Sequence, residues 1–143
     1  MNDTIEKFGY PATLIHEYDH WVVLLRPAQP TLGSLVLAAK SDTLAFSKLP
    51  AEAFEELAIV TAHIEAVLSE AVKFEKLNYL MLMMVDPHVH YHVIPRYEGD
   101  RIRAGQAYAD AGWPKVPQLG EAVNLSEADI AELTAWLKGL WPR

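Results

Sequence analysis

The sequence contains no cysteine, so disulfide bonds and thiolate metal sites are excluded. A chain without cysteine suits a reducing cytosol better than an oxidising compartment, and we therefore expect a cytoplasmic protein. The segment from Met1 to Lys7 has neither the basic region nor the apolar region of a signal peptide. These absences argue against a secreted, disulfide-stabilised protein.

Long apolar runs are also absent, and basic residues are few. The longest apolar stretch, from Tyr79 to Val85, is far shorter than the roughly 20 residues that span a bilayer. Lys and Arg number 12 against 19 Asp and Glu, which gives a formal net charge of −7. This charge argues against broad affinity for nucleic-acid polymers or anionic membranes. A small nucleotide is still compatible with it, because a pocket needs only a few local donors and cations.

A chain of 143 residues suits one domain with a substantial core. Short apolar segments predict strands, and apolar residues at three- and four-residue spacing predict one long helix. The strands are expected near 14–17, 21–25, 34–40, 76–85 and 88–94, and the helix near 49–73. The second strand is too apolar to be half-exposed and should be interior. This order predicts an α+β fold, an antiparallel meander with the long helix across one face.

The chain beyond residue 97 has a different composition. Residues 98–123 are rich in glycine, proline and charge, and we predict an irregular segment there. A capping pattern beginning at Ser126 predicts a C-terminal helix at about 126–140. Residues 1–143 are therefore assigned to a single domain whose core lies at about 8–97.

Three of the six histidines fall at alternate positions within five residues: His88, His90 and His92. Alternate side chains of a strand share a face, so all three are expected on one face, with Val89, Tyr91 and Val93 on the other. A single histidine is more often structural than chemical. Three in register on a strand with an apolar opposite face indicate a reactive site.

Imidazole is a good nucleophile toward phosphorus, because it is neutral and basic near pH 7 and its phosphorylated form is a good leaving group. Attack by the middle histidine requires its far ring nitrogen to be free. The near nitrogen should then carry the proton and donate it, most simply to a backbone carbonyl.

The run His88-Val89-His90-Tyr91-His92-Val93-Ile94 resembles the signature of the histidine triad (HIT) superfamily of nucleotide hydrolases and transferases. The resemblance implies a HIT-like fold and cleavage at the α-phosphate of a nucleotide conjugate, either a dinucleoside polyphosphate or a phosphoramidate. It implies that His90 is the nucleophile that carries a transient nucleotidyl group, that His92 lies by the leaving group, and that His88 supports the site. It also implies that no metal or other cofactor is needed, and that the protein forms a homodimer.

The resemblance further implies three substrate-binding positions. Asn78 matches an asparagine that is frequent in the family. Arg26 stands where a ribose-binding acid or amide is common, and Ser34 stands where the family often has a fourth histidine after the glycine of a hairpin turn. The two departures bear on the identity of the substrate more than on the type of reaction.

Two other readings of the histidine pattern are open. A His-x-His pair can bind a metal, although His88 and His92 lie about 13 Å apart on a regular strand and do not then share one ion. Alternatively, the chain is a nucleotide-binding module without catalysis. Chelator-sensitive activity favours the metal, and tight binding without turnover favours the module.

Overall fold

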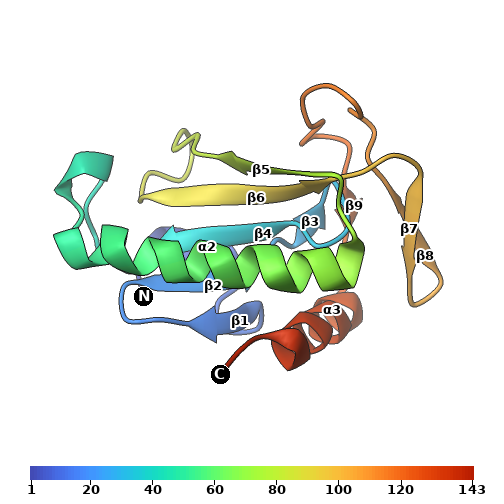
Figure 1. The fold of residues 1–143 in the computed structure, drawn as a ribbon. Helices are drawn as coiled ribbons and strands as arrows, with labels where there is room; N and C mark the ends of the chain where they lie inside the picture. Colours follow the sequence, from blue (N-terminus) through green and yellow to red (C-terminus); the bar gives the residue numbers. More distant parts are fainter.

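The protein is built around a five-stranded antiparallel sheet in the order β1-β2-β4-β6-β5 (Figure 1). The structure, a computed structural model, describes residues 1–143. The sheet strands are β1 (Leu14–Glu17), β2 (Trp21–Leu25), β4 (Leu35–Ala39), β5 (Lys76–Leu80) and β6 (His90–Arg96). The predicted α+β fold is confirmed, and all five residues of the interior strand β2 are buried.

The strand order departs from a strictly sequential meander at one point. After β4 the chain passes through the short 3₁₀ helix η1 (Phe46–Lys48) and the long helix α2, and it re-enters the sheet at the far edge as β5. The following strand, β6, then fits between β5 and β4. As a result His90 lies opposite Ala38, and His92 lies opposite both Val36 and Leu80. The histidine strand is therefore flanked on both sides.

Helix α2 (Ala51–Val72) covers one face of the sheet (Figure 1). Pro50 occupies its N-cap position, where the missing proline donor costs nothing, and Lys73 ends it in a left-handed conformation with φ of 56°. The apolar stripe of the helix packs into the same core as the sheet residues Leu35, Leu37 and Val93. That stripe consists of Val60, Ile64, Val67, Leu68 and Val72. Its burial fixes which face of β6 is core and leaves the other face for the site.

The opposite face of the sheet is partly covered by a short N-terminal helix, α1 (Asp3–Lys7), which was not predicted from the sequence. Asn2 caps this helix by accepting from the Ile5 backbone N–H at 3.0 Å. Its side-chain nitrogen donates to the carbonyls of Ala39 and Ser41, both at 3.0 Å. Ile5 packs on Val22, Leu24, Val36 and Ala38. The cap and this packing hold α1 against the sheet.

Two strand predictions had incorrect bounds. The segment predicted as a strand from 76 to 85 leaves the sheet after Leu80, and the histidine strand begins at His90 rather than at residue 88. The physical reason is the lack of a partner: β4 ends at Ala39, whose N–H makes the last bond, to the Val89 carbonyl. Residues 81–89 therefore form a connection, although their composition is largely apolar.

The segment from 98 to 123 is not wholly irregular. It contains a hairpin of β7 (Asp100–Arg103) and β8 (Gln106–Ala109), which lies beside one end of the main sheet (Figure 1). The two residues of its turn, Ala104 and Gly105, have φ of 50° and 78°. This is the geometry of a tight hairpin turn. The turn was not predicted because its first residue is alanine, whereas asparagine or glycine is usual at that position.

Two further elements close the structure. Strand β9 (Val123–Asn124) pairs with β3 (Ala28–Gln29), and the expected C-terminal helix is α3 (Glu127–Leu140). Ser126 caps α3 by accepting from the Asp129 N–H at 3.2 Å. Leu133 and Leu137 of this helix are buried in the main core. None of the helices is both long enough and apolar enough to cross a bilayer.

Candidate functional site

His90 and His92 lie together on the sheet face opposite α2. Their cross-strand partners Ala38 and Val36 belong to the apolar cluster on that face. The two imidazole rings meet edge to face, with centroids 5.1 Å apart and an interplanar angle of 78°. Both residues are almost fully buried. The strand thus presents two adjacent imidazoles to one enclosed space, as the alternate spacing predicted.

His88 is not part of the strand that presents the other two imidazoles, because it precedes the first residue of β6. Its ring Nδ1 lies 2.9 Å from Oγ1 of Thr4, on α1, and its backbone N–H donates to the same hydroxyl oxygen at 3.3 Å. The expectation that all three histidines belong to one strand is therefore wrong for His88, which lies before that strand. It reaches the site through its backbone carbonyl, which lies 2.7 Å from Nδ1 of His90.

This contact selects the tautomer of the neutral His90 ring. A carbonyl oxygen only accepts hydrogen bonds, so Nδ1 of His90 must carry the proton that it donates to His88. The other nitrogen, Nε2, then has a free lone pair. The orientation of the ring and its tautomer are both those that a nucleophilic imidazole requires.

The two imidazoles open into a cavity of about 230 Å³. Phe8, which follows α1, packs against both rings with centroid distances of 5.7 Å and 5.8 Å. Arg26 and Asp86 bring the only formal charges to the lining. The remaining wall is apolar and comes from the connection between β5 and β6 and from the segment after β8: Leu82, Met83, Met84, Val85 and Leu119. The cavity combines a polar floor with an apolar rim.

Arg26 lies directly after β2 and contacts His92. Its Nε donates to Nδ1 of His92 at 3.3 Å, and its Nη1 donates to the Ala28 carbonyl at 2.6 Å. Burial, the charge of Arg26 and the neighbouring His90 together lower the pKa of His92 to about 4, against an opposing effect of Asp86. His92 is therefore a neutral imidazole at physiological pH.

This shift predicts a pH dependence of stability. The pKa of His92 is about 6.5 in the unfolded chain, whereas it is about 4 in the folded protein. Between these values the unfolded state holds more protons, so the stabilisation present above pH 6.5 is lost as the pH falls toward 4. Urea unfolding between pH 4 and 7 is expected to give a flatter pH profile for His92→Gln than for wild type. His20→Gln, outside the cavity, is the control, and equal slopes for wild type and His92→Gln would contradict the assignment.

Of the three expected substrate-binding residues, only Arg26 reaches this cavity. Ser34 is fully buried, and its hydroxyl donates to the Thr31 carbonyl at 2.8 Å, so it stabilises its own turn instead. Asn78 lies on β5, and its side-chain oxygen accepts from Nη1 of Arg96 at 2.8 Å. It lines a separate cavity of about 510 Å³ together with Trp113.

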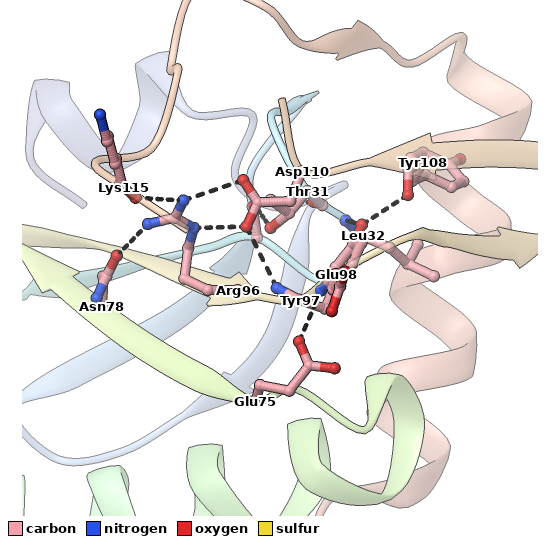
Figure 2. Close-up of polar contacts among 11 residues, drawn as sticks. Thr31, Leu32, Glu75, Asn78, Arg96, Tyr97, Glu98, Tyr108, Asp110 and Lys115 are labelled. Atoms are coloured by element: carbon pink, nitrogen blue, oxygen red, sulfur yellow. Dashed lines mark hydrogen bonds and ion pairs between the residues drawn. The ribbon is translucent and has the colours of Figure 1, made fainter. Parts of the chain in front are cut away.

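Arg96 is the centre of a buried polar cluster next to that second cavity (Figure 2). Its Nε and Nη2 donate to the two carboxylate oxygens of Asp110 at 2.7 Å and 3.1 Å, and Nη2 also donates to the Lys115 carbonyl at 2.7 Å. The side chains of Arg96 and Asp110 are only 5% and 1% exposed. This cluster ties the segment after β8 to strands β5 and β6.

The sequence reasoning missed Thr4 and Phe8, both of which belong to the N-terminal segment beside the histidines. A weak signal for this segment was present. Asn2 followed by Asp3 and Glu6 is typical of a capped helix start, but five residues are too few for a periodic pattern. Nothing in the sequence indicated that this helix would pack at the histidine strand.

The metal-binding alternative gains no further ligand from the fold. No group of three or more histidine, cysteine, aspartate or glutamate side chains is arranged to hold one ion. An ion bound by His90 and His92 would lack the third protein ligand that zinc sites use.

Comparison with known proteins gives the family. A family model described as HIT domain matches residues 8–99, whereas no curated protein matches the chain. A histidine triad protein from Bradyrhizobium japonicum has a TM-score of 0.73 at 18% identity and covers 99% of this chain and 96% of its own. A histidine triad protein from Sinorhizobium meliloti 1021 has a TM-score of 0.73 at 23% identity, with 97% and 94% covered.

A more distant neighbour is named for its activity. The diadenosine triphosphate hydrolase of Plasmodium falciparum has a TM-score of 0.66 at 10% identity, and the likeness covers 96% of this chain and 92% of that one. Likeness at such identities shows the fold alone. The family model, however, spans well over half of the residues and includes the histidine strand, so this chain belongs to the histidine triad (HIT) family.

Proposed function

We propose that the protein is a cytoplasmic nucleotide hydrolase or nucleotidyl transferase that acts at the α-phosphate of a nucleotide conjugate through a covalent intermediate on His90. The observation that carries this proposal is the 2.7 Å contact between Nδ1 of His90 and the His88 carbonyl. It leaves the lone pair of Nε2 free for attack. The family membership and the diadenosine triphosphate hydrolase among its structural neighbours support the same class of chemistry.

The reaction has two balanced steps. The Nε2 lone pair of His90 attacks the α-phosphorus, a P–N bond forms, and the bond to the leaving group breaks with its electron pair going to that group. Water then attacks the same phosphorus, the P–N bond breaks, and the electron pair returns to Nε2 while water loses a proton to solvent. The His88 carbonyl stabilises the positively charged imidazole of the intermediate through the Nδ1 proton.

The lining of the cavity supports a nucleotide conjugate as substrate. Arg26 supplies a positive charge for a phosphate group, and Phe8 with the apolar rim supplies contact area for a nucleoside. Both a dinucleoside polyphosphate and a phosphoramidate meet these requirements. We also propose a homodimer, because β5 is an edge strand and a second copy extending the sheet would cover it.

Intact-protein mass spectrometry tests the proposal. Wild-type protein is exposed briefly, with chelator present, to diadenosine triphosphate and, separately, to adenosine phosphoramidate. We expect an added mass of one adenylyl group and release of nucleotide with at least one of them. Tight binding without adduct or turnover would indicate a nucleotide-binding module that is not an enzyme. Loss of activity on chelation would favour the metal-dependent alternative.

A further inference from the structure

We propose that Arg26 is a positioning residue that holds His92 as the tautomer with its proton on Nε2, so that the two adjacent imidazoles present opposite groups to the cavity. His90 then offers a lone pair, and His92 offers a hydrogen-bond donor. The catalytic meaning of this arrangement rests on the proposed function, whereas the tautomer itself is a property of the substrate-free protein. This role differs from the sugar or phosphate contact that the position of Arg26 in the sequence implied.

The tautomer follows from the kind of groups in contact. A guanidinium group has N–H donors only and no acceptor. Nε of Arg26 donates to Nδ1 of His92 at 3.3 Å, so this nitrogen must hold a lone pair. The proton of the neutral ring is then on Nε2. At His90 the partner of Nδ1 is a carbonyl oxygen, which only accepts. In the neutral His90 ring the proton is therefore on Nδ1 and the lone pair on Nε2. Two neighbouring histidines are thus set in opposite tautomers by opposite partners.

Arg26 is held firmly enough to act in this way. Its Nη1 donates to the Ala28 carbonyl at 2.6 Å. Its backbone N–H donates to the Ser34 carbonyl at 3.0 Å, and its own carbonyl accepts from the Gln29 side chain at 2.6 Å. Both the backbone and the side chain are therefore fixed. An arginine whose only task is to capture phosphate does not need these restraints.

Burial keeps His92 neutral, and Arg26 from the end of β2 and His90 from β6 add to this effect. Asp86, from the connection between β5 and β6, opposes it. Asp86 is itself paired with Lys7 at 2.7 Å, which reduces its effect on the ring. With Arg26 on the Nδ1 side, protonation of that nitrogen would place two cations in contact. His92 therefore donates a hydrogen bond from Nε2. It is not an imidazolium, so it has no acidic proton to transfer to a leaving group.

This constrains the leaving group. A neutral imidazole stabilises negative charge on phosphate oxygens, but it does not protonate a departing amine. A phosphate leaving group departs as an anion and needs no proton, whereas an alkylamine leaving group does need one. The geometry thus favours conjugates that release a phosphate over conjugates that release an amine. This selectivity refines the substrate class left open above.

The tautomer is tested by two-bond ¹H–¹⁵N correlation spectra of ¹⁵N-histidine-labelled, substrate-free protein. In wild type we expect a Nδ1-protonated His90 and a Nε2-protonated His92. In Arg26→Met the His92 pattern is expected to shift toward the other tautomer or an exchanging mixture, while His90 keeps its pattern. Arg103→Met removes an arginine that pairs with Glu132 far from the site and is the matched control. A Nδ1-protonated His92 in wild type would overturn the proposal, and this measurement needs no variant to fold.

Kinetics supply the second test. Arg26→Met is expected to lower kcat for diadenosine triphosphate by about tenfold or more, because the donor at His92 is lost. Activity on an alkylamine phosphoramidate should fall less, so the ratio of the two kcat/KM values moves toward the amine substrate. A rise in KM alone with an unchanged His92 spectrum would show that Arg26 only binds phosphate, and would refute the positioning role. If wild type turns over no nucleotide, the proposed function fails while the spectra still decide the tautomer.

Discussion

Replacing His90 by alanine is expected to lower the rate of nucleotidyl transfer by on the order of 10³-fold or more. In the proposed mechanism the variant loses the atom that forms the bond to phosphorus, and no other group in the cavity replaces it. His92, the nearest imidazole, has Nδ1 occupied by Arg26, and its pKa is lowered to about 4, so it is a poor substitute.

The measurement is single-turnover release of nucleotide from diadenosine triphosphate, combined with the mass of the intact protein. The His90→Ala variant should show neither release nor adduct, although it should still bind nucleotide. His20→Ala, a histidine outside the cavity, is the matched control and should keep wild-type turnover. Adduct formation by the His90→Ala protein would contradict the assignment of the nucleophile, and a full loss of activity in His20→Ala would point to a general effect on folding.

Replacing Asp110 by alanine is expected to lower the free energy of unfolding by about 3–5 kcal/mol. Asp110 is 1% exposed and accepts two hydrogen bonds from Arg96, itself 5% exposed (Figure 2). It also accepts from the Tyr97 backbone N–H at 3.2 Å. Removing the carboxylate leaves a guanidinium buried without its counter-charge, and this desolvation cost dominates the effect. Urea denaturation gives the size of the change.

Two further variants define the mechanism of that loss. Asp100→Ala removes an exposed carboxylate from β7 without breaking a hydrogen bond or ion pair of its side chain, and it should change stability by no more than about 0.5 kcal/mol. The double variant Arg96→Met and Asp110→Leu removes both charges and should recover part of the stability lost in Asp110→Ala. A loss below about 1 kcal/mol for Asp110→Ala would show that the pair is not the anchor of the segment after β8.

Local sequence patterns were sufficient for much of the fold. The three- and four-residue apolar spacing predicted α2, and the Ser126 pattern predicted α3, because helix periodicity and capping depend on residues close in the chain. Alternation placed His90 and His92 on one face of a strand, and the need for a free nitrogen predicted a backbone partner for His90. These inferences concern spacings within a single element, where sequence distance and spatial distance agree.

The edges of elements and the roles of single side chains followed from long-range contacts instead. The histidine strand begins at His90 because its partner β4 ends, so His88 contacts His90 through its backbone carbonyl and Thr4, 84 residues away, through its ring. Asn78 and Ser34 have partners of their own away from the histidines.

Local patterns in the sequence are enough to predict an α+β protein with a histidine strand. The contact of Arg26 with His92, 66 residues away, and the pairing of Arg96 with Asp110 depend on the folded chain. Periodicity reports which face a side chain occupies, but the identity of its partner depends on how distant strands and loops pack together, which no local pattern encodes.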